Sequence, residues 1–329
     1  MYGKPKWVKD QSKRINGYYV GFGSFSKSGL SSNEYISAAN EAAFLDISQQ
    51  IRVNIYGSTA STLYDDGINR YDSAEFESKS STVSDLEGLE KEEIYETSDR
   101  YFVLWKLSKE KHKKNIEKNA AIAKNFYQQS ITTVFNQVDE LSNLVKGFES
   151  VLKAYGQVIT YGEGRDRVVL NTYFVTRIEE IFSRISVKAI NYNQNTTFGK
   201  GLDAPLIFNA VYNDMVTRPL SGVPVKFIVT KGEMSLREDL LTNGEGSCET
   251  TVSKVSSEIP DQIVSAYIDL AQFKQEKGKN VYLDRILLEI TNKRSVEYRI
   301  NVSQMTAERI AVKVLPQEGL PRGEDSFIN

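Results

Sequence analysis

A long, regular apolar stripe in the middle of the chain constrains the fold more than any other feature of the sequence. Its residues recur at alternating steps of four and three, the spacing of a helix packed along a partner in a left-handed helix pair. These candidate helix-seam contacts are Tyr127, Ile131, Val134, Val138, Leu141, Val145, Phe148 and Leu152. The spacing therefore predicts a helix whose apolar face is covered by another helix.

The helix that carries this seam is predicted to begin well before it. Ser108 is a suitable N-cap residue, and Glu110 follows in the first turn. Upstream apolar residues continue the pattern into Tyr127; they are Ile116, Ala120 and Ala123. Two successive steps of four meet at Tyr127, a stutter that locally relaxes the supercoil. A helix continuous over 108–153 would be about 70 Å long at roughly 1.5 Å per residue.

A second helical stretch can cover part of the seam. Its apolar residues, spaced by three or four, are Leu170, Phe174, Ile178, Ile181 and Ile185. Glycines at Gly156, Gly162 and Gly164 end helices and favour turns in the stretch between. Residues 108–186 are therefore predicted to form a long helical hairpin. Because its second helix is the shorter, part of the seam is left for the first region or another subunit, and a homo-oligomer is an open expectation.

From about Val187 the apolar pattern changes to short β-rich runs separated by turns. The clearest runs cover residues 205–212, 219–229, 247–252 and 262–268. Turn signals at 213–214, 231–232 and 243–244 join them. Alternate residues Val223, Val225, Phe227 and Val229 share one strand face, while Pro224 indicates an edge or a strand start. Further β-like runs cover 281–290 and 296–302, and residues 316–329 have the composition of a flexible tail.

The first region, residues 1–107, is predicted to form a helix on an antiparallel sheet. A strand at 18–25 contains Gly21 and Gly23 and precedes an alanine-rich helix. The helix face contains Ile36, Ala39, Ala43 and Ile47, widened by Ala38, Ala42 and Leu45. A second strand is expected around Ile51, Val53 and Ile55, and a hairpin over 89–95 and 101–107. Residues 64–85 are interpreted as an excursion between them.

This first region resembles the LPP-twenty lipoproteins of bacterial cell envelopes. The matching residues are Pro5, Trp7, Gly21, Gly23, Ala39, Ala43 and Ile51. The resemblance implies a role in building outer-membrane or surface structures, envelope proteins as partners, and a periplasmic or outer-membrane-associated location. It also implies a lipid anchor, although the lipid-attachment cysteine does not occur at the start of this sequence. Membrane contact is expected only through that inferred anchor, and the export signal is expected to have been removed.

A second resemblance concerns roughly residues 187–275. The run Pro219-Leu-Ser-Gly-Val-Pro-Val-Lys-Phe, the Lys231-Gly232 turn and the run Thr242-Asn-Gly-Glu-Gly resemble bacterial immunoglobulin-like domains of the invasin type. Such sandwiches hold together through alternating inward residues and need no disulfide. The predicted fold class is thus α+β: an α+β domain over 1–107, a helical hairpin over 108–186, an immunoglobulin-like sandwich with extra strands over 187–315, and a tail over 316–329.

Composition narrows the possible partners. Lys and Arg total 41 against 43 for Asp and Glu, so no overall field attracts nucleic acid or an anionic membrane. The single cysteine, Cys248, excludes an internal disulfide and a thiolate metal cluster, and it is expected to act as a small buried hydrophobic residue. No apolar run approaches the roughly 20 residues that span a bilayer, and the first residues lack the apolar core of a signal peptide.

The sequence offers no recognisable catalytic motif. Gly21 and Gly23 lack the third glycine of a dinucleotide fingerprint, because Ser26 occupies that position. The single histidine, His112, lies among lysines and is expected on a solvated helix face. Glu92, Glu93 and Glu96 could supply paired carboxylates for sugar hydrolysis, although their separation cannot be read from the spacing. We therefore expect no catalytic residue, cofactor or metal.

The favoured hypothesis is a non-enzymatic envelope protein that acts in binding or assembly. Two alternatives remain open at this point. One is a carboxylate-dependent hydrolase of envelope polysaccharide, and the other is a module that binds a small ligand or peptide between helix and sheet.

Overall fold

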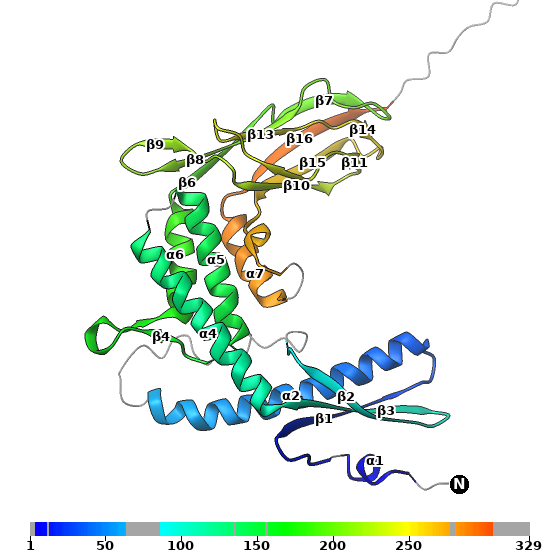
Figure 1. Ribbon diagram of the computed structural model, residues 1–329. Helices are drawn as coiled ribbons and strands as arrows, with labels where there is room; N and C mark the ends of the chain where they lie inside the picture. Colours follow the sequence, from blue (N-terminus) through cyan, green and yellow to red (C-terminus); the bar gives the residue numbers. More distant parts are fainter. Residues whose placement is uncertain are drawn as a thin grey trace, which may run out of the picture.

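The computed structural model describes residues 4–11, 13–63, 86–133, 136–154, 157–276 and 280–304. It arranges the chain in three stacked parts (Figure 1): an N-terminal sheet with helices, a group of packed helices, and a β-sandwich at the far end. This mixed architecture confirms the predicted α+β fold class. In the described part of the chain, no helix is long and apolar enough to cross a membrane.

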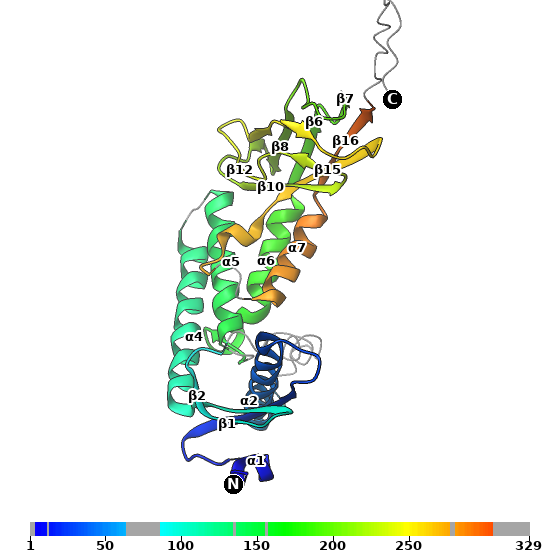
Figure 2. The ribbon, with the colours of Figure 1, turned by 90° about the vertical axis from the view of Figure 1, so that its right-hand side faces the viewer.

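The N-terminal layer has one small antiparallel sheet, in the strand order β1-β3-β2. Its elements are α1 (Lys6–Asp10), β1 (Tyr18–Ser26), α2 (Ser32–Leu63), β2 (Leu89–Glu96) and β3 (Arg100–Ser108). Helix α2 covers one face of the sheet, and the short helix α1 lies against the other (Figure 2). On that second face, Trp7 and Val8 pack with Phe102 and Leu104. The predicted β2–β3 hairpin is confirmed.

Strand β1 and helix α2 approach so closely that their contact admits only glycine on the strand. A Cβ atom at Gly21 would overlap the carbonyl oxygen of Ala43, and one at Gly23 would overlap that of Ala39. Both alanines are fully buried. This confirms that the two glycines are close-packing positions beneath the alanine face. Ala42 and Leu45, which were expected to widen that face, are exposed.

The strand expected around Ile51, Val53 and Ile55 is wrong, because helix α2 continues to Leu63. Ile47 and Ile51 are four residues apart and both buried, so the helical face simply extends past the point where alternation suggested a strand. The excursion predicted for 64–85 lies outside the described residues.

The middle part of the molecule is a group of packed helices. Its elements are α4 (Lys109–Thr132), α5 (Gln137–Lys153), β4 (Thr160–Tyr161), η2 (Gly164–Asp166), β5 (Val168–Val169), α6 (Leu170–Ser183), η3 (Leu270–Phe273) and α7 (Val281–Asn292). Ser108 caps α4 as predicted, because its hydroxyl accepts a hydrogen bond from the backbone N–H of Lys111. All the predicted apolar positions of the second helix are buried; four lie in α6, and Ile185 begins the next strand.

The long first helix of the predicted hairpin is not continuous. Thr133 adopts an extended backbone after α4, and Asn136 starts α5 as an N-cap whose side chain accepts a hydrogen bond from the N–H of Asp139 at 2.9 Å. The chain reverses here, so α5 runs back along α4, and the Asn119 side-chain amide meets the carbonyl of Lys153. Apolar residues are spaced by four and three within each of the two helices. This spacing alone does not reveal that the chain reverses between them.

The run 281–290, predicted to be β-like, is also wrong, because it forms helix α7. Leu283, Leu287 and Ile290 are spaced by four and three and are buried, which is a helical pattern. Asn280 caps this helix by accepting a hydrogen bond from the N–H of Leu283 at 2.8 Å.

The third part is a sandwich of two sheets. Its strands are β6 (Ile185–Ile190), β7 (Asn193–Thr197), β8 (Leu206–Asn213), β9 (Thr217–Pro219), β10 (Pro224–Lys231), β11 (Met234–Ser235), β12 (Asp239–Leu241), β13 (Ser247–Thr250), β14 (Lys254–Val255), β15 (Asp261–Ile268) and β16 (Val296–Ser303). One sheet has the order β12-β10-β15-β16-β7, and the other has β13-β8-β6 with β9 beside β8, while β11 and β14 form a separate two-stranded pair. The predicted runs 205–212, 247–252, 262–268 and 296–302 are confirmed as strands. Pro224 begins β10, which confirms the expected strand start.

The core of the sandwich lies between the two sheets and continues into the helices. Phe208, Phe227 and Tyr298 are fully buried there, and the Tyr298 hydroxyl donates to the carbonyl of Ile207 in the opposite sheet at 2.7 Å. A single cluster of buried apolar residues includes both this core and the facing sides of α5, α6 and α7. The two parts therefore share one continuous core.

The link between the sandwich and the helices is an excursion between two paired strands. Strands β15 and β16 are hydrogen-bonded neighbours, but the chain between them leaves the sheet and forms η3 and α7 against α5 and α6 (Figure 1). We call this excursion the β15–β16 insertion. Helix α7 thus belongs to the stretch predicted to form the sandwich, yet it packs on the stretch predicted to form the helical hairpin. The predicted domain limits stay a prediction. The predicted tail, 316–329, lies outside the described residues.

A buried carboxylate fastens the insertion to α5. Glu149 is 2% exposed and accepts hydrogen bonds from the backbone N–H groups of Gln275, at 2.6 Å, and Glu276, at 3.3 Å. The ammonium of Lys153 lies 3.0 Å from Glu149 and 3.2 Å from Glu276. Burial lowers the pKa of Lys153, but the two carboxylates outweigh it, and the net pKa is raised. We call these four residues the insertion joint.

Candidate functional site

The candidate helix-seam residues lie mainly inside the helical group. Leu141, Val145, Phe148 and Leu152 of α5, together with Tyr127 of α4, are buried within the chain, and Val138 is half-buried. Ile131 is 54% exposed near the end of α4, and Val134 lies outside the described residues. The α5 part of the seam is therefore covered by helices of the same chain. Oligomerisation through the seam stays a prediction.

The glutamates considered for hydrolysis are paired with lysines on the sheet of the N-terminal layer. Lys106 lies 2.7 Å from Glu92, Lys13 contacts both Glu92 and Glu93, and Lys27 lies 2.6 Å from Glu96. The hydrogen bond from Lys106 is the main cause that lowers the pKa of Glu92. A proton donor for glycoside hydrolysis needs a raised pKa. These contacts stabilise the ionised form of Glu92 instead.

His112 is not on a solvated face, so that expectation is wrong. Its side chain is 4% exposed, and its ring meets the ring of Tyr19 edge-on with the centroids 5.9 Å apart. Burial lowers the pKa of His112 to about 4. The lysines around it in sequence occupy the other faces of α4, and the imidazole is an internal contact between α4 and β1.

Cys248 lies in β13 and is buried, as expected from the sequence. Burial raises the pKa of its thiol to about 12, which suppresses the thiolate form at neutral pH. Over the described ranges, no three or more His, Cys, Asp and Glu side chains gather in a way that could hold a metal ion.

Strand β12 is the terminal strand of its sheet, and β13 of the other sheet lies beside its outer edge. There the Arg237 N–H donates to the Thr250 hydroxyl, and that hydroxyl donates to the Arg237 carbonyl. This strand pairs with β10 on one side, with Leu241 opposite Pro224 and Asp239 opposite Lys226. Glu238 and Thr242 direct their backbone groups toward β10, because the N–H of Phe227 donates to the Glu238 carbonyl and the N–H of Thr242 donates to the Val223 carbonyl. Alternate residues of an antiparallel strand point the opposite way. The backbone groups of Asp239 and Leu241 therefore point outward.

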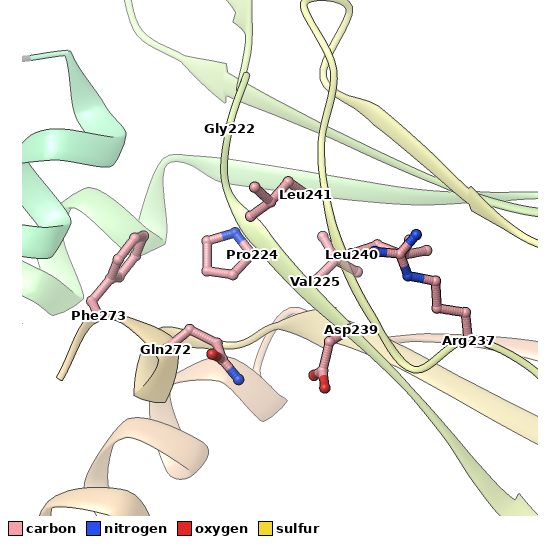
Figure 3. Close-up of a pocket in the computed structure, with 9 residues that line it drawn as sticks. All are labelled: Gly222, Pro224, Val225, Arg237, Asp239, Leu240, Leu241, Gln272 and Phe273. Atoms are coloured by element: carbon pink, nitrogen blue, oxygen red, sulfur yellow. The ribbon is translucent and has the colours of Figure 1, made fainter. Parts of the chain in front are cut away.

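An open pocket of about 330 Å³ lies beside this edge, where the sandwich meets η3 (Figure 3). Its apolar lining comes from Pro224, Val225, Leu240, Leu241 and Phe273. Its polar lining comes from Arg237, Asp239 and Gln272, with Gly222 at one end. Leu241 is 66% exposed although its neighbours in the pocket are apolar. An open apolar hollow with a few polar groups at its rim suits a peptide side chain or a small ligand.

Several carboxylates lie near β12. Burial is the main cause that raises the pKa of Tyr267, and the carboxylates of Asp269, Asp239 and Glu238 raise it further. Arg237 is the basic residue of the pocket lining. Lys226 lies opposite Asp239 in the strand register, so charges of both signs surround the pocket.

Sequence reasoning identified only part of this edge. Pro224 correctly indicated the start of a strand. Strand β12 is three residues long, too short to show alternation, and was not predicted. A detectable signal would have been Leu240 and Leu241 directly before the Asn243-Gly244 turn. The contribution of η3 could not be found in this way, because it depends on how the insertion docks.

Comparison with known proteins leaves the family of this chain open. No family model matches the sequence, and the LPP-twenty family is therefore not matched either. No curated protein matches the sequence. Two solved structures share partial similarity. The D0-D1 domain of intimin is 20% identical over 29% of this chain and 43% of its own length, with a TM-score of 0.19. WR4, a C. elegans MSP family member, is 9% identical over 37% of this chain and 97% of its own, with a TM-score of 0.22.

Proposed function

We propose that this protein is a non-enzymatic binding and assembly protein of the bacterial cell envelope, and that it takes up a peptide segment at the pocket beside β12. The observation that carries the proposal is the pocket, where Leu241 is exposed beside an apolar lining. Burial of an apolar side chain of the partner there would supply affinity, and Arg237, Asp239 and Gln272 at the rim would supply selectivity.

The envelope location rests on the sequence resemblance of the N-terminal region. Fractionation of cells that express the full-length gene product should place it with the periplasm or the outer membrane. Recovery in the cytoplasm alone would contradict this part of the proposal.

The binding role is tested by a photo-crosslinking amino acid at Leu241 in the full chain. We expect adducts with a protein segment, identified by mass spectrometry, and none from the same probe at Leu288 of α7, which is also exposed. Turnover of an envelope glycan that Glu93→Gln abolishes, without any adduct at Leu241, would overturn the proposal and favour the hydrolase.

A further inference from the structure

We propose that the tip of the β8–β9 hairpin of one copy of this chain inserts into the pocket beside β12 of a second copy. The tip is the turn over residues 214–216, between the two strands. This inference rests on the proposed function and names the partner of the pocket as a second copy of the same protein. Its supports are the exposure of the tip, the lining of the pocket, the separation of the two within one chain, and the charges beside them.

The tip carries two adjacent apolar side chains that the rest of the described chain leaves uncovered. Met215 is 99% exposed and Val216 is 62% exposed. Every residue from 213 to 219 is exposed, and Figure 1 shows the hairpin extending from the side of the sandwich. Apolar side chains gathered at one projecting point are suited to contact with another molecule.

The pocket offers an apolar lining to such a tip. Leu241 and Phe273 lie on either side of Pro224 there (Figure 3), and Leu241 is itself exposed. With a volume of about 330 Å³ the pocket has room for a Met side chain, whose flexibility lets it fill irregular hollows. Contact between tip and pocket would remove apolar surface of both from water, which favours association.

Strand β9 holds the tip away from the pocket of its own chain. It pairs with β8 along its whole length, and the N–H of Leu220 continues the ladder by donating to the carbonyl of Ala210. At about 3.3 Å per residue, this extended run keeps Met215 roughly 15 Å beyond Leu220.

The pocket extends from Leu220 in the opposite direction. The Thr242 hydroxyl donates to the Leu220 carbonyl, and from there β12 runs beside β13 to Arg237. Arg237 is hydrogen-bonded to Thr250, which pairs with Leu206 at the start of β8, the end remote from the tip. A chain that keeps its β8–β9 ladder cannot fill its own pocket, so a tip in the pocket belongs to another molecule.

Charged side chains beside the two surfaces can pair across this contact. Arg218 follows the tip, Asp239 lines the pocket, and neither forms an ion pair within the part of the chain that the structure describes. Asp214 in the tip and Arg237 in the pocket lining supply a second pair of opposite sign. Opposite charges on facing surfaces favour the correct encounter and fix its register.

Two full-length variants, each with one new lysine, test this contact. Met215→Lys alters the tip and Leu241→Lys alters the pocket, and both residues are exposed, so the fold is kept. We expect wild-type chains to associate with increasing concentration in light scattering, and each variant alone to associate at least about ten-fold more weakly. An equal mixture of the two variants should recover association, because the intact tip of one meets the intact pocket of the other.

Ile259→Lys is the matched control. Ile259 is 42% exposed and precedes β15 at the end that is remote from the pocket, since Val225 of the pocket pairs with Ile268 at the other end. This variant should associate like wild type. When ¹⁵N-labelled chains with the photo-crosslinker at Leu241 are mixed with unlabelled wild-type chains, adducts should join the labelled pocket to unlabelled residues 214–216.

A mixture of Met215→Lys and Leu241→Lys that associates no more than either variant alone would overturn the proposal, as would a wild-type chain that stays monomeric. If the Leu241 probe captures a segment of a different protein, or a segment of this chain other than the tip, this inference falls and the proposed function stands. If it captures no segment at all, both fall.

Discussion

Two helix contacts in this protein differ in the chemistry of their most buried residues. In the N-terminal layer, α2 lies on β1 through buried alanines and two glycines, and the half-buried Asp46 beside them accepts a hydrogen bond from the Phe22 N–H. In the insertion joint, α5 holds the chain before α7 through the buried carboxylate of Glu149. The first contact is specific because nothing larger fits, and the second because a buried charge needs its partners. The first therefore tolerates little added volume, and the second tolerates little loss of a polar group.

Removing the carboxylate should produce the largest effect. Glu149→Ala leaves Lys153 without its nearest counter-charge and two backbone N–H groups without an acceptor. We expect a loss of about 3–5 kcal/mol in the free energy of unfolding, measured by urea denaturation. Hydrogen exchange should accelerate in η3 and α7 first.

Glu117→Ala is the matched control on α4. Glu117 pairs with Lys113 at 3.8 Å on the surface, and we expect almost no change in stability. Equal losses in the two variants would mean that burial does not strengthen the insertion joint.

A third contact, between α4 and β1, is made by His112, a titratable side chain that is buried as an apolar side chain would be. Its folded pKa of about 4 lies below the ordinary 6.5, so the folded chain keeps it neutral while the unfolded chain binds a proton. Its stabilising contribution is complete above pH 6.5 and declines as the pH falls toward 4, by on the order of 3 kcal/mol.

His112→Phe should flatten the pH dependence of unfolding between pH 6.5 and 4. The protein contains one histidine, so the comparison with wild type isolates this group. Parallel curves for the two proteins would show that burial of His112 has no such cost.

Added volume in the N-terminal contact should produce a smaller but definite loss. Gly23→Ala forces a Cβ atom against the backbone of Ala39, and we expect about 1–3 kcal/mol of destabilisation. Both tryptophans, Trp7 and Trp105, lie in this layer, so tryptophan fluorescence follows its unfolding. Gly244→Ala, where a Cβ meets open space, should leave the transition unchanged.

The smallest effect should come from a single hydrogen bond across the sandwich. Tyr298→Phe removes the hydroxyl that donates to Ile207 and should cost about 1 kcal/mol. Urea denaturation measures the change in the free energy of unfolding. A decrease as large as that of Glu149→Ala would show that a neutral buried hydrogen bond matters as much as a charged one.

The sequence predicted the elements whose signal is local. The alternation of Val223, Val225 and Phe227, the cap at Ser108 and the close approach at Gly23 all follow from neighbouring residues. The sequence-based prediction failed where the same spacing of apolar residues is compatible with two structures. The seam spacing continues across the reversal after Thr133, so it does not distinguish one long helix from two antiparallel helices. The run from Leu283 to Ile290 forms a helix, and the helices that it packs against are distant in the sequence.

The candidate site shows the same division. Pro224 and the Asn243-Gly244 turn bounded the region of the edge, but the pocket exists only because η3 docks beside β12. That docking depends on Glu149, which lies 126 residues from its partner Gln275 in the chain.

By itself the sequence determined the periods of its helices and strands, the glycine contact beneath α2, and a near-neutral chain with one cysteine. Only the tertiary structure decided that the chain folds back between α4 and α5, that the β15–β16 insertion joins the sandwich to the helices, and that a pocket forms where η3 meets β12. The physical reason is that periodicity and steric fit act between near neighbours. The partner of a buried charge or a strand edge is set by distant parts of the chain.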